Sequence, residues 1–102
     1  MKARFLSVAE QELADAFDWY ERESPGVGYE FAAEVDRTVR RVVHYPEACA
    51  DLGEGVRRAL ICRFPYGLWY AIEQDTLVVY AVAHLHRQPR YWASRTARQA
   101  EG

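Results

Sequence analysis

The sequence has little of several features that would mark a specialised class of protein. Two cysteines, Cys49 and Cys62, are too few for a disulfide scaffold and lack C-x-x-C spacing, so we expect reduced thiols. The longest apolar run, residues 77–83, is far shorter than the ~20 residues that span a bilayer. Residues 1–10 carry an acidic residue where a signal peptide needs an apolar stretch. We therefore expect a cytoplasmic protein with no membrane partner, no metal site and no cofactor.

Lysine is almost absent, and the charge is unevenly distributed along the chain. Lys2 is the only lysine, and the other twelve basic residues are arginines, which suit bidentate contacts with phosphate or carboxylate. The net charge is −2, but residues 1–56 carry −6 and residues 57–102 carry +4. A genome rich in G and C would give the same arginine bias. The basic C-terminal half is nevertheless where we expect an acidic or amphipathic partner segment to bind.

The length of 102 residues predicts one domain over the whole chain, with residues 93–102 as a flexible tail. A short strand over residues 3–6 precedes two amphipathic helices. Ser7 and Glu10 fit a capping box, which places the start of the first helix at Ser7. The second helix begins near Tyr29 and ends before Pro46. Because a short turn joins them, the two helices should form an antiparallel hairpin.

Three segments rich in β-branched and aromatic residues follow, over residues 57–63, 67–73 and 76–85. The last two should form an antiparallel β-hairpin. Alternation in the last strand puts Val78, Tyr80, Val82 and His84 on one face, which His86 extends if the strand continues. Both faces of this strand are apolar, which predicts an interior position. The expected fold class is α+β, with an N-terminal strand and a helical hairpin packed on an antiparallel sheet of about four strands.

Three sequence segments, in this order of elements, resemble the RelE/ParE family of toxins. They are Trp-Tyr-Glu at residues 19–21, Arg-Phe-Pro-Tyr-Gly at residues 63–67, and residues 81–92, which run from Ala-Val-Ala-His to Arg-Tyr-Trp. The resemblance implies a RelE/ParE-like toxin domain that inhibits growth as half of a type II toxin-antitoxin module, with a cognate antitoxin as partner. Some members of the family cut messenger RNA in the ribosomal A site, whereas others inhibit DNA gyrase without nuclease activity.

Metal-free RNA cleavage needs a base, an acid and a cation that stabilises the charge developing on phosphate. His84 and His86 are the expected base and acid, Arg63 and Arg87 the phosphate clamp, and Tyr91 a proton donor or stacking partner. Lysines serve in some family members, but the corresponding strand here opens with two arginines. Arginine does not lose its proton at neutral pH, so it cannot replace a lysine base, and histidine or Glu73 would have to serve instead. The expected binding residues are Arg57, Arg58, Arg90 and Trp92.

Each of these residues also has a structural interpretation. His84 can be a partly buried strand-end residue, Arg63 and Arg87 can pair with helix acids, and Tyr91 and Trp92 can clasp the tail to the core. Because the two histidines, Arg87 and Tyr91 fall within eight residues, we slightly favour a ribosome-dependent endoribonuclease. The alternatives are a non-enzymatic inhibitor of DNA gyrase and an inactive toxin-like interaction module.

Overall fold

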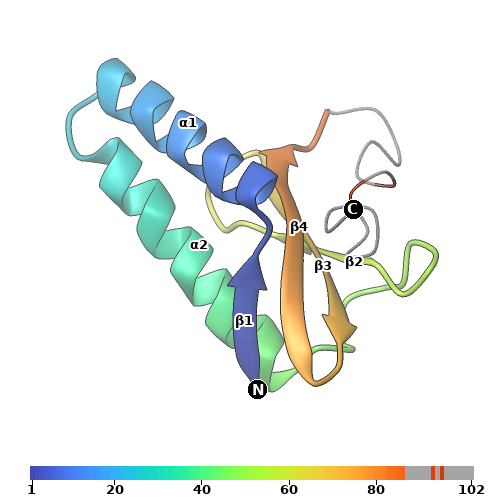
Figure 1. Cartoon of the computed structure of the whole chain (residues 1–102). Coiled ribbons are helices and arrows are strands. Elements are labelled where there is room, and N and C mark those ends of the chain that lie inside the picture. The colour runs from blue at the N-terminus through green and yellow to red at the C-terminus, as the bar shows by residue number, and fades with distance from the viewer. Residues whose placement is uncertain (87–92, 94, 96–102) are drawn as a thin grey trace.

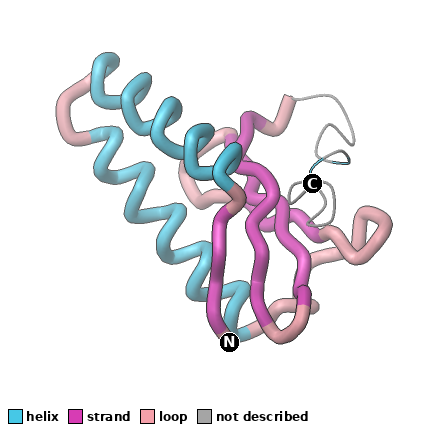
Figure 2. Tube along the Cα trace, viewed as in Figure 1, coloured by secondary structure: helices cyan, strands magenta, loops and turns pink. Residues whose placement is uncertain are grey.

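The computed structural model describes residues 1–86, 93 and 95, in which two helices pack on one face of a four-stranded sheet (Figures 1 and 2). This arrangement confirms the α+β class and the predicted order of elements. The bounds are Lys2–Phe5 for β1, Ser7–Glu23 for α1, Val27–His44 for α2, Arg57–Leu60 for β2, Tyr66–Glu73 for β3 and Thr76–His84 for β4. Among the described residues, no helix combines the length and apolar character needed to cross a membrane.

The sheet is mixed rather than antiparallel. Its strand order is β1-β4-β3-β2, so β4 lies inside the sheet as predicted. The strands β2, β3 and β4 pair antiparallel in sequence, but β1 pairs parallel with β4. Parallel pairing needs a long connection between the two strands, and here the helical hairpin with β2 and β3 supplies it. The all-antiparallel expectation was therefore wrong at one edge.

The face alternation expected for β4 is interrupted inside the strand. Val78 pairs with Ala71 and Val82 pairs with Leu68, with a register shift between these two pairs. Directly paired residues share a face, and Ala71 and Leu68 are three positions apart on β3, so they lie on opposite faces. Val78 and Val82 therefore do not share a face as predicted, because β4 carries one extra residue in a β-bulge. His84, paired with Tyr66, follows the reoriented half of the strand.

The first helix starts at Ser7 as predicted, but the capping box does not form. Leu6 occupies the N-cap position without a side-chain cap bond, and the backbone N–H of Glu10 donates to the Leu6 carbonyl at 2.9 Å. Leu6 is also still tied to the sheet, since its own N–H donates to the Val79 carbonyl at 3.0 Å. Pairing with β4 thus extends as far as Leu6 and leaves Ser7 as the first helical residue rather than the cap.

A close approach of the two helices fixes their hairpin. The backbone N–H of Gly28, in the first turn of α2, donates to the Glu21 carboxylate of α1 at 2.8 Å. The acidic side chain therefore satisfies a helix N-terminus on the neighbouring helix. A Cβ atom at Gly28 would lie 2.6 Å from the Phe17 carbonyl oxygen, so only glycine fits. Gly26 precedes α2 with a φ of 93°, which allows the sharp turn.

An aromatic cluster joins the hairpin to the start of β3. Phe31 of α2 is fully buried, and its ring centroid lies 5.2 Å from that of Tyr20, 5.1 Å from Phe64 and 5.0 Å from Tyr66. The pairs of Phe31 with Phe64 and Tyr66 are edge-to-face, and such pairs add to the stabilisation that burial itself gives. Trp19 contacts Tyr20 at 5.0 Å but remains 50% exposed, so the cluster reaches the surface there.

Candidate functional site

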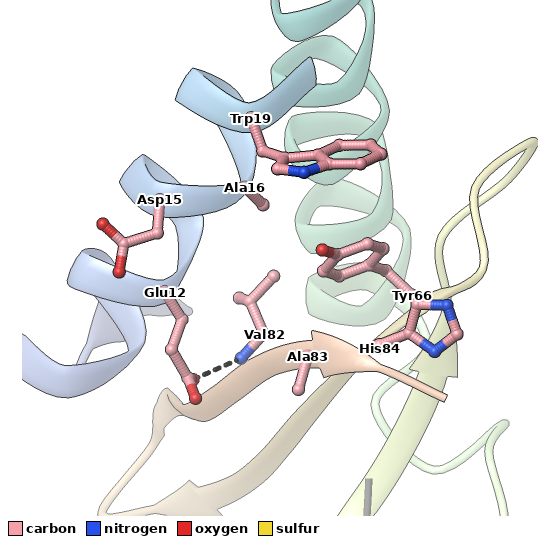
Figure 3. A pocket seen from close by; sticks show the side chains of 8 residues that line it. All are labelled: Glu12, Asp15, Ala16, Trp19, Tyr66, Val82, Ala83 and His84. Carbon is pink, nitrogen blue, oxygen red and sulfur yellow. Dashed lines mark hydrogen bonds between the residues drawn. The ribbon is translucent and has the colours of Figure 1, made fainter. Parts of the chain in front are cut away.

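A pocket of about 260 Å³ opens between α1 and the end of β4 (Figure 3). Glu12 and Asp15 of α1 line one side of the opening, with the Asp15 carboxylate turned outward, and the rings of Trp19, Tyr66 and His84 lie on the other side. The small side chains Ala16, Val82 and Ala83 complete the lining. The pocket therefore combines an acidic side, an aromatic side and an apolar floor.

Glu12 supplies a hydrogen-bond acceptor to β4 beyond the end of its pairing with β1. The pairing of β1 with β4 ends at Phe5 and Val79, so the later residues of β4 have no partner in β1. The backbone N–H of Val82 donates instead to Glu12 Oε1 at 3.0 Å (Figure 3). The same carboxylate oxygen accepts a bond from Arg95 Nη1 at 2.9 Å, in an ion pair with both side chains about four-fifths buried.

His84 and His86 come together at the end of β4. Their rings stack with centroids 4.8 Å apart, and the His84 ring lies 5.6 Å from that of Tyr66. The backbone N–H of His86 donates to His84 Nδ1 at 3.2 Å. In a neutral imidazole the nitrogen that accepts is not the one that carries the proton, so this bond places the proton of neutral His84 on Nε2.

Arg63 faces the second helix rather than the pocket. It lies in the turn after β2 with a φ of 72°, and Nη2 donates to Glu30 Oε1 at 2.7 Å. Nη1 lies 3.6 Å from Glu34 Oε2, whose side chain is nearly buried. The hydrogen bond with Glu30 raises the pKa of the Arg63 guanidinium above its ordinary value. Arg63 therefore pairs with acidic residues of α2, which is one of the two interpretations that the sequence allowed.

Arg57 and Arg58, predicted as binding residues, both have contacts within the fold. The Nη1 atom of Arg57 donates to the backbone carbonyls of Glu47, at 3.4 Å, and of Cys49. It thereby fastens the loop before β2. The Arg58 guanidinium lies 6.0 Å from the ring centroid of Trp69, a cation–π distance. The other four predicted site residues lie outside the described residues: Arg87, Arg90, Tyr91 and Trp92.

Comparison with known proteins identifies the family. The family model described as the ParE toxin of the type II toxin-antitoxin system, parDE, matches residues 3–89. The chain belongs to the ParE toxin family. A chain of the solved chromosomal ParDE toxin-antitoxin system from P. aeruginosa is similar in fold, with a TM-score of 0.73 and 16% identity. The match covers 84% of the present chain and 97% of that chain. The comparison with curated proteins gave no match.

The ParE family assignment confirms the predicted RelE/ParE resemblance, but the pocket adds residues that the sequence reasoning missed. Glu12 and Asp15 lie three positions apart on α1, and Trp19 follows at a helical spacing, so all three fall on one side of the helix. That spacing was the available signal. Both acids also fall largely away from the apolar stripe of the helix, which is typical of a solvated surface and gives no sign of a pocket.

Proposed function

We propose that this ParE family protein is the toxin of a type II toxin-antitoxin module and inhibits growth by binding DNA gyrase, without cleaving RNA. One observation carries the choice of binding over cleavage: the Glu12 and Asp15 carboxylates line the same pocket as His84. A ribonuclease centre concentrates cations where charge develops on phosphate, and RNA itself is a polyanion. Glu12 is paired with Arg95, but the Asp15 carboxylate, which accepts from the neutral Gln11 amide, still repels such a substrate.

The neighbouring groups support the same choice. Arg63, proposed as a phosphate clamp, has its guanidinium on the carboxylates of Glu30 and Glu34. His84 Nδ1 accepts the His86 N–H, so this nitrogen is engaged and a neutral ring presents a donor at Nε2 rather than a second base. Both contacts favour binding over cleavage, while Arg87 and Tyr91, on which the endoribonuclease preference also rested, lie outside the described residues.

The endoribonuclease remains the second candidate because of one contact. The stacked rings of His84 and His86, at a centroid separation of 4.8 Å, put two imidazoles within reach of one substrate group. A base and an acid in such proximity serve the attack of a 2′-hydroxyl on phosphate. In this candidate the target is a ribosome carrying messenger RNA.

Two parallel assays test the proposal. The purified protein is added to DNA gyrase with relaxed plasmid, and to a reconstituted translation system with a defined messenger RNA. We expect loss of supercoiling and intact messenger RNA. The His84→Gln/His86→Gln double variant keeps hydrogen bonding but removes titration, and it should still inhibit gyrase. Cleavage of the messenger RNA by the wild type that disappears in the double variant would establish the nuclease instead.

The cognate antitoxin is the second partner in this proposal. The +4 charge of residues 57–102 favours an acidic or amphipathic antitoxin segment, through steering and burial. Titration of the labelled toxin with its antitoxin should shift amide signals between residues 57 and 98. Shifts confined to residues 7–45 would contradict this placement.

A further inference from the structure

We infer that the pocket between α1 and β4 binds an arginine side chain presented by a partner protein. The inference rests on the proposed function in one respect, namely that the pocket serves binding rather than cleavage. The acidic side of the pocket is made by Glu12 and Asp15, and the aromatic side includes Trp19 and Tyr66. Arginine has a long apolar stem, a planar cation that pairs with carboxylates, and a tendency to stack on aromatic rings.

The electrostatics of α1 favour a cation at this position. Ser7–Glu23 carries six acidic residues and one basic residue, Arg22. Asp15 accepts a hydrogen bond from the neutral amide of Gln11 at 2.9 Å, and within the described part of the chain no cation pairs with its carboxylate. A guanidinium that enters the pocket therefore meets a negative field from the helix and a charged acceptor at the rim.

The structure already contains one guanidinium at the edge of the pocket. Arg95 donates to Glu12 at 2.9 Å and lies 3.5 Å from the Tyr80 carbonyl oxygen. Glu12 also holds the Val82 N–H, so its bonded oxygen is shared between two donors. Glu12 is thus already paired with a cation, whereas among the described residues Asp15 accepts only from the neutral Gln11 amide. We place the head of the incoming side chain at Asp15 and its stem over Ala16 and Val82.

The size of the pocket fits one side chain. Its volume of about 260 Å³ is below the ≈ 300–1,000 Å³ that is typical of pockets for small organic ligands and cofactors. Trp19 is 50% exposed at the rim, where its ring is available to cover an inserted stem. The pocket therefore accommodates a single cationic side chain presented on a peptide.

The test uses short peptides and the full-length protein. The probe is Ac-Gly-Arg-Gly-amide, and the matched control probe carries citrulline, which has the same shape without the charge. Binding is followed by ¹⁵N NMR. We expect the arginine peptide to shift the Trp19 indole signal and the amide signals of Val82 and His84, and the citrulline peptide to shift them little. Equal shifts with both peptides, or arginine shifts confined to other residues, would overturn the inference.

Two variants that each remove one negative charge from α1 distinguish binding in the pocket from general electrostatic attraction to the helix. Asp15→Asn should weaken binding of the arginine peptide at least about tenfold, because a charge-assisted hydrogen bond contributes ≈ 1.5–3 kcal/mol. Asp18→Asn removes the same charge from the same helix at a residue that does not line the pocket, and it should weaken binding far less. Equal weakening of peptide binding by both variants would show that the peptide responds only to the overall charge of α1, which would contradict the inference. Failure of peptide binding with gyrase inhibition intact would reject this inference alone.

Discussion

Glu12 of α1 accepts the backbone N–H of Val82 of β4, seventy residues later in the chain, at 3.0 Å. Through this bond a helix side chain satisfies an edge of the sheet that β1 leaves uncovered after Phe5. A buried N–H without a partner is costly, so the bond stabilises the junction between hairpin and sheet. It also fixes the Glu12 carboxylate at the wall of the pocket. Folding and site geometry thus depend on the same contact.

We expect Glu12→Ala to lower the free energy of unfolding by about 1–3 kcal/mol, because the Val82 N–H then loses its acceptor. Glu12→Gln should cost less, since the amide oxygen still accepts the bond. Urea denaturation measures both changes. The control is Asp18→Ala on the same helix, whose exposed side chain predicts a change within about 0.5 kcal/mol. A Glu12→Ala protein as stable as the control would show that the bond contributes nothing.

The hydrophobic pattern of the sequence predicted the helices and strands better than their ends and irregularities. The helices follow a clear apolar period, and the apolar character of both faces of β4 correctly indicated an interior strand. The bulge could not be predicted for the same reason. Every side chain in residues 77–83 is apolar or aromatic, so one extra residue does not change the hydrophobic pattern. The capping box at Ser7 failed for a related reason, since the extension of the sheet to Leu6 is a long-range contact.

Only part of the candidate site could be predicted from the sequence, because the rest depends on long-range contacts. His84 and His86 are two residues apart, so their proximity follows from the local chain. The partners of Arg63 lie about thirty residues earlier on α2, and the sequence offered pairing with helix acids only as one of two interpretations. Asp15 is exposed, and its charge alone does not distinguish a pocket wall from a solvated surface. Its role depends on how α1 crosses β4.

Gly28→Ala should destabilise the protein although it adds a better helix former. In an unconstrained helix the change would stabilise by about 1 kcal/mol. Here the new Cβ would lie 2.6 Å from the Phe17 carbonyl oxygen and 2.5 Å from Cγ of Glu21, so the two helices must separate. We expect a lower melting temperature in a thermal unfolding scan followed by circular dichroism. A rise in melting temperature would contradict the close packing of the hairpin.

Tyr70 should make the protein sensitive to alkaline pH. Burial, followed by hydrogen bonding with Cys49, raises the pKa of its phenol well above the ordinary value of 10.0. The unfolded chain releases this proton near pH 10 while the folded chain retains it, so stability is full below that pH and falls as pH rises above it. Tyr70→Phe should flatten this fall. The variant also loses the bond from the Tyr70 hydroxyl to the Pro46 carbonyl, which should cost about 0.5–1.5 kcal/mol at neutral pH.

Urea unfolding at neutral pH and at several values above pH 10 measures both effects. Tyr45→Phe is the control, because the Tyr45 side chain is 67% exposed. If the free energy of unfolding falls equally with rising pH in the wild type and in Tyr70→Phe, another titrating group causes the fall. Tyr20 is the next one to replace, since burial and the nearby Tyr66 also raise its pKa.

The ion pair between Arg63 and Glu30 allows the role of Arg63 to be separated from its contribution to the fold. Both side chains are at least half exposed, so solvent screens the pair and breaking it should change the stability little. Arg63→Ala and Glu30→Ala should therefore both fold with nearly wild-type stability. Only Arg63→Ala removes a guanidinium that a carboxylate of a protein target can bind in exchange for Glu30. We expect Arg63→Ala to reduce growth inhibition and Glu30→Ala to leave it intact, measured by induced expression at matched protein levels. Equal loss in the two variants would assign Arg63 to positioning of the turn against α2, and full inhibition by Arg63→Ala would remove it from the site.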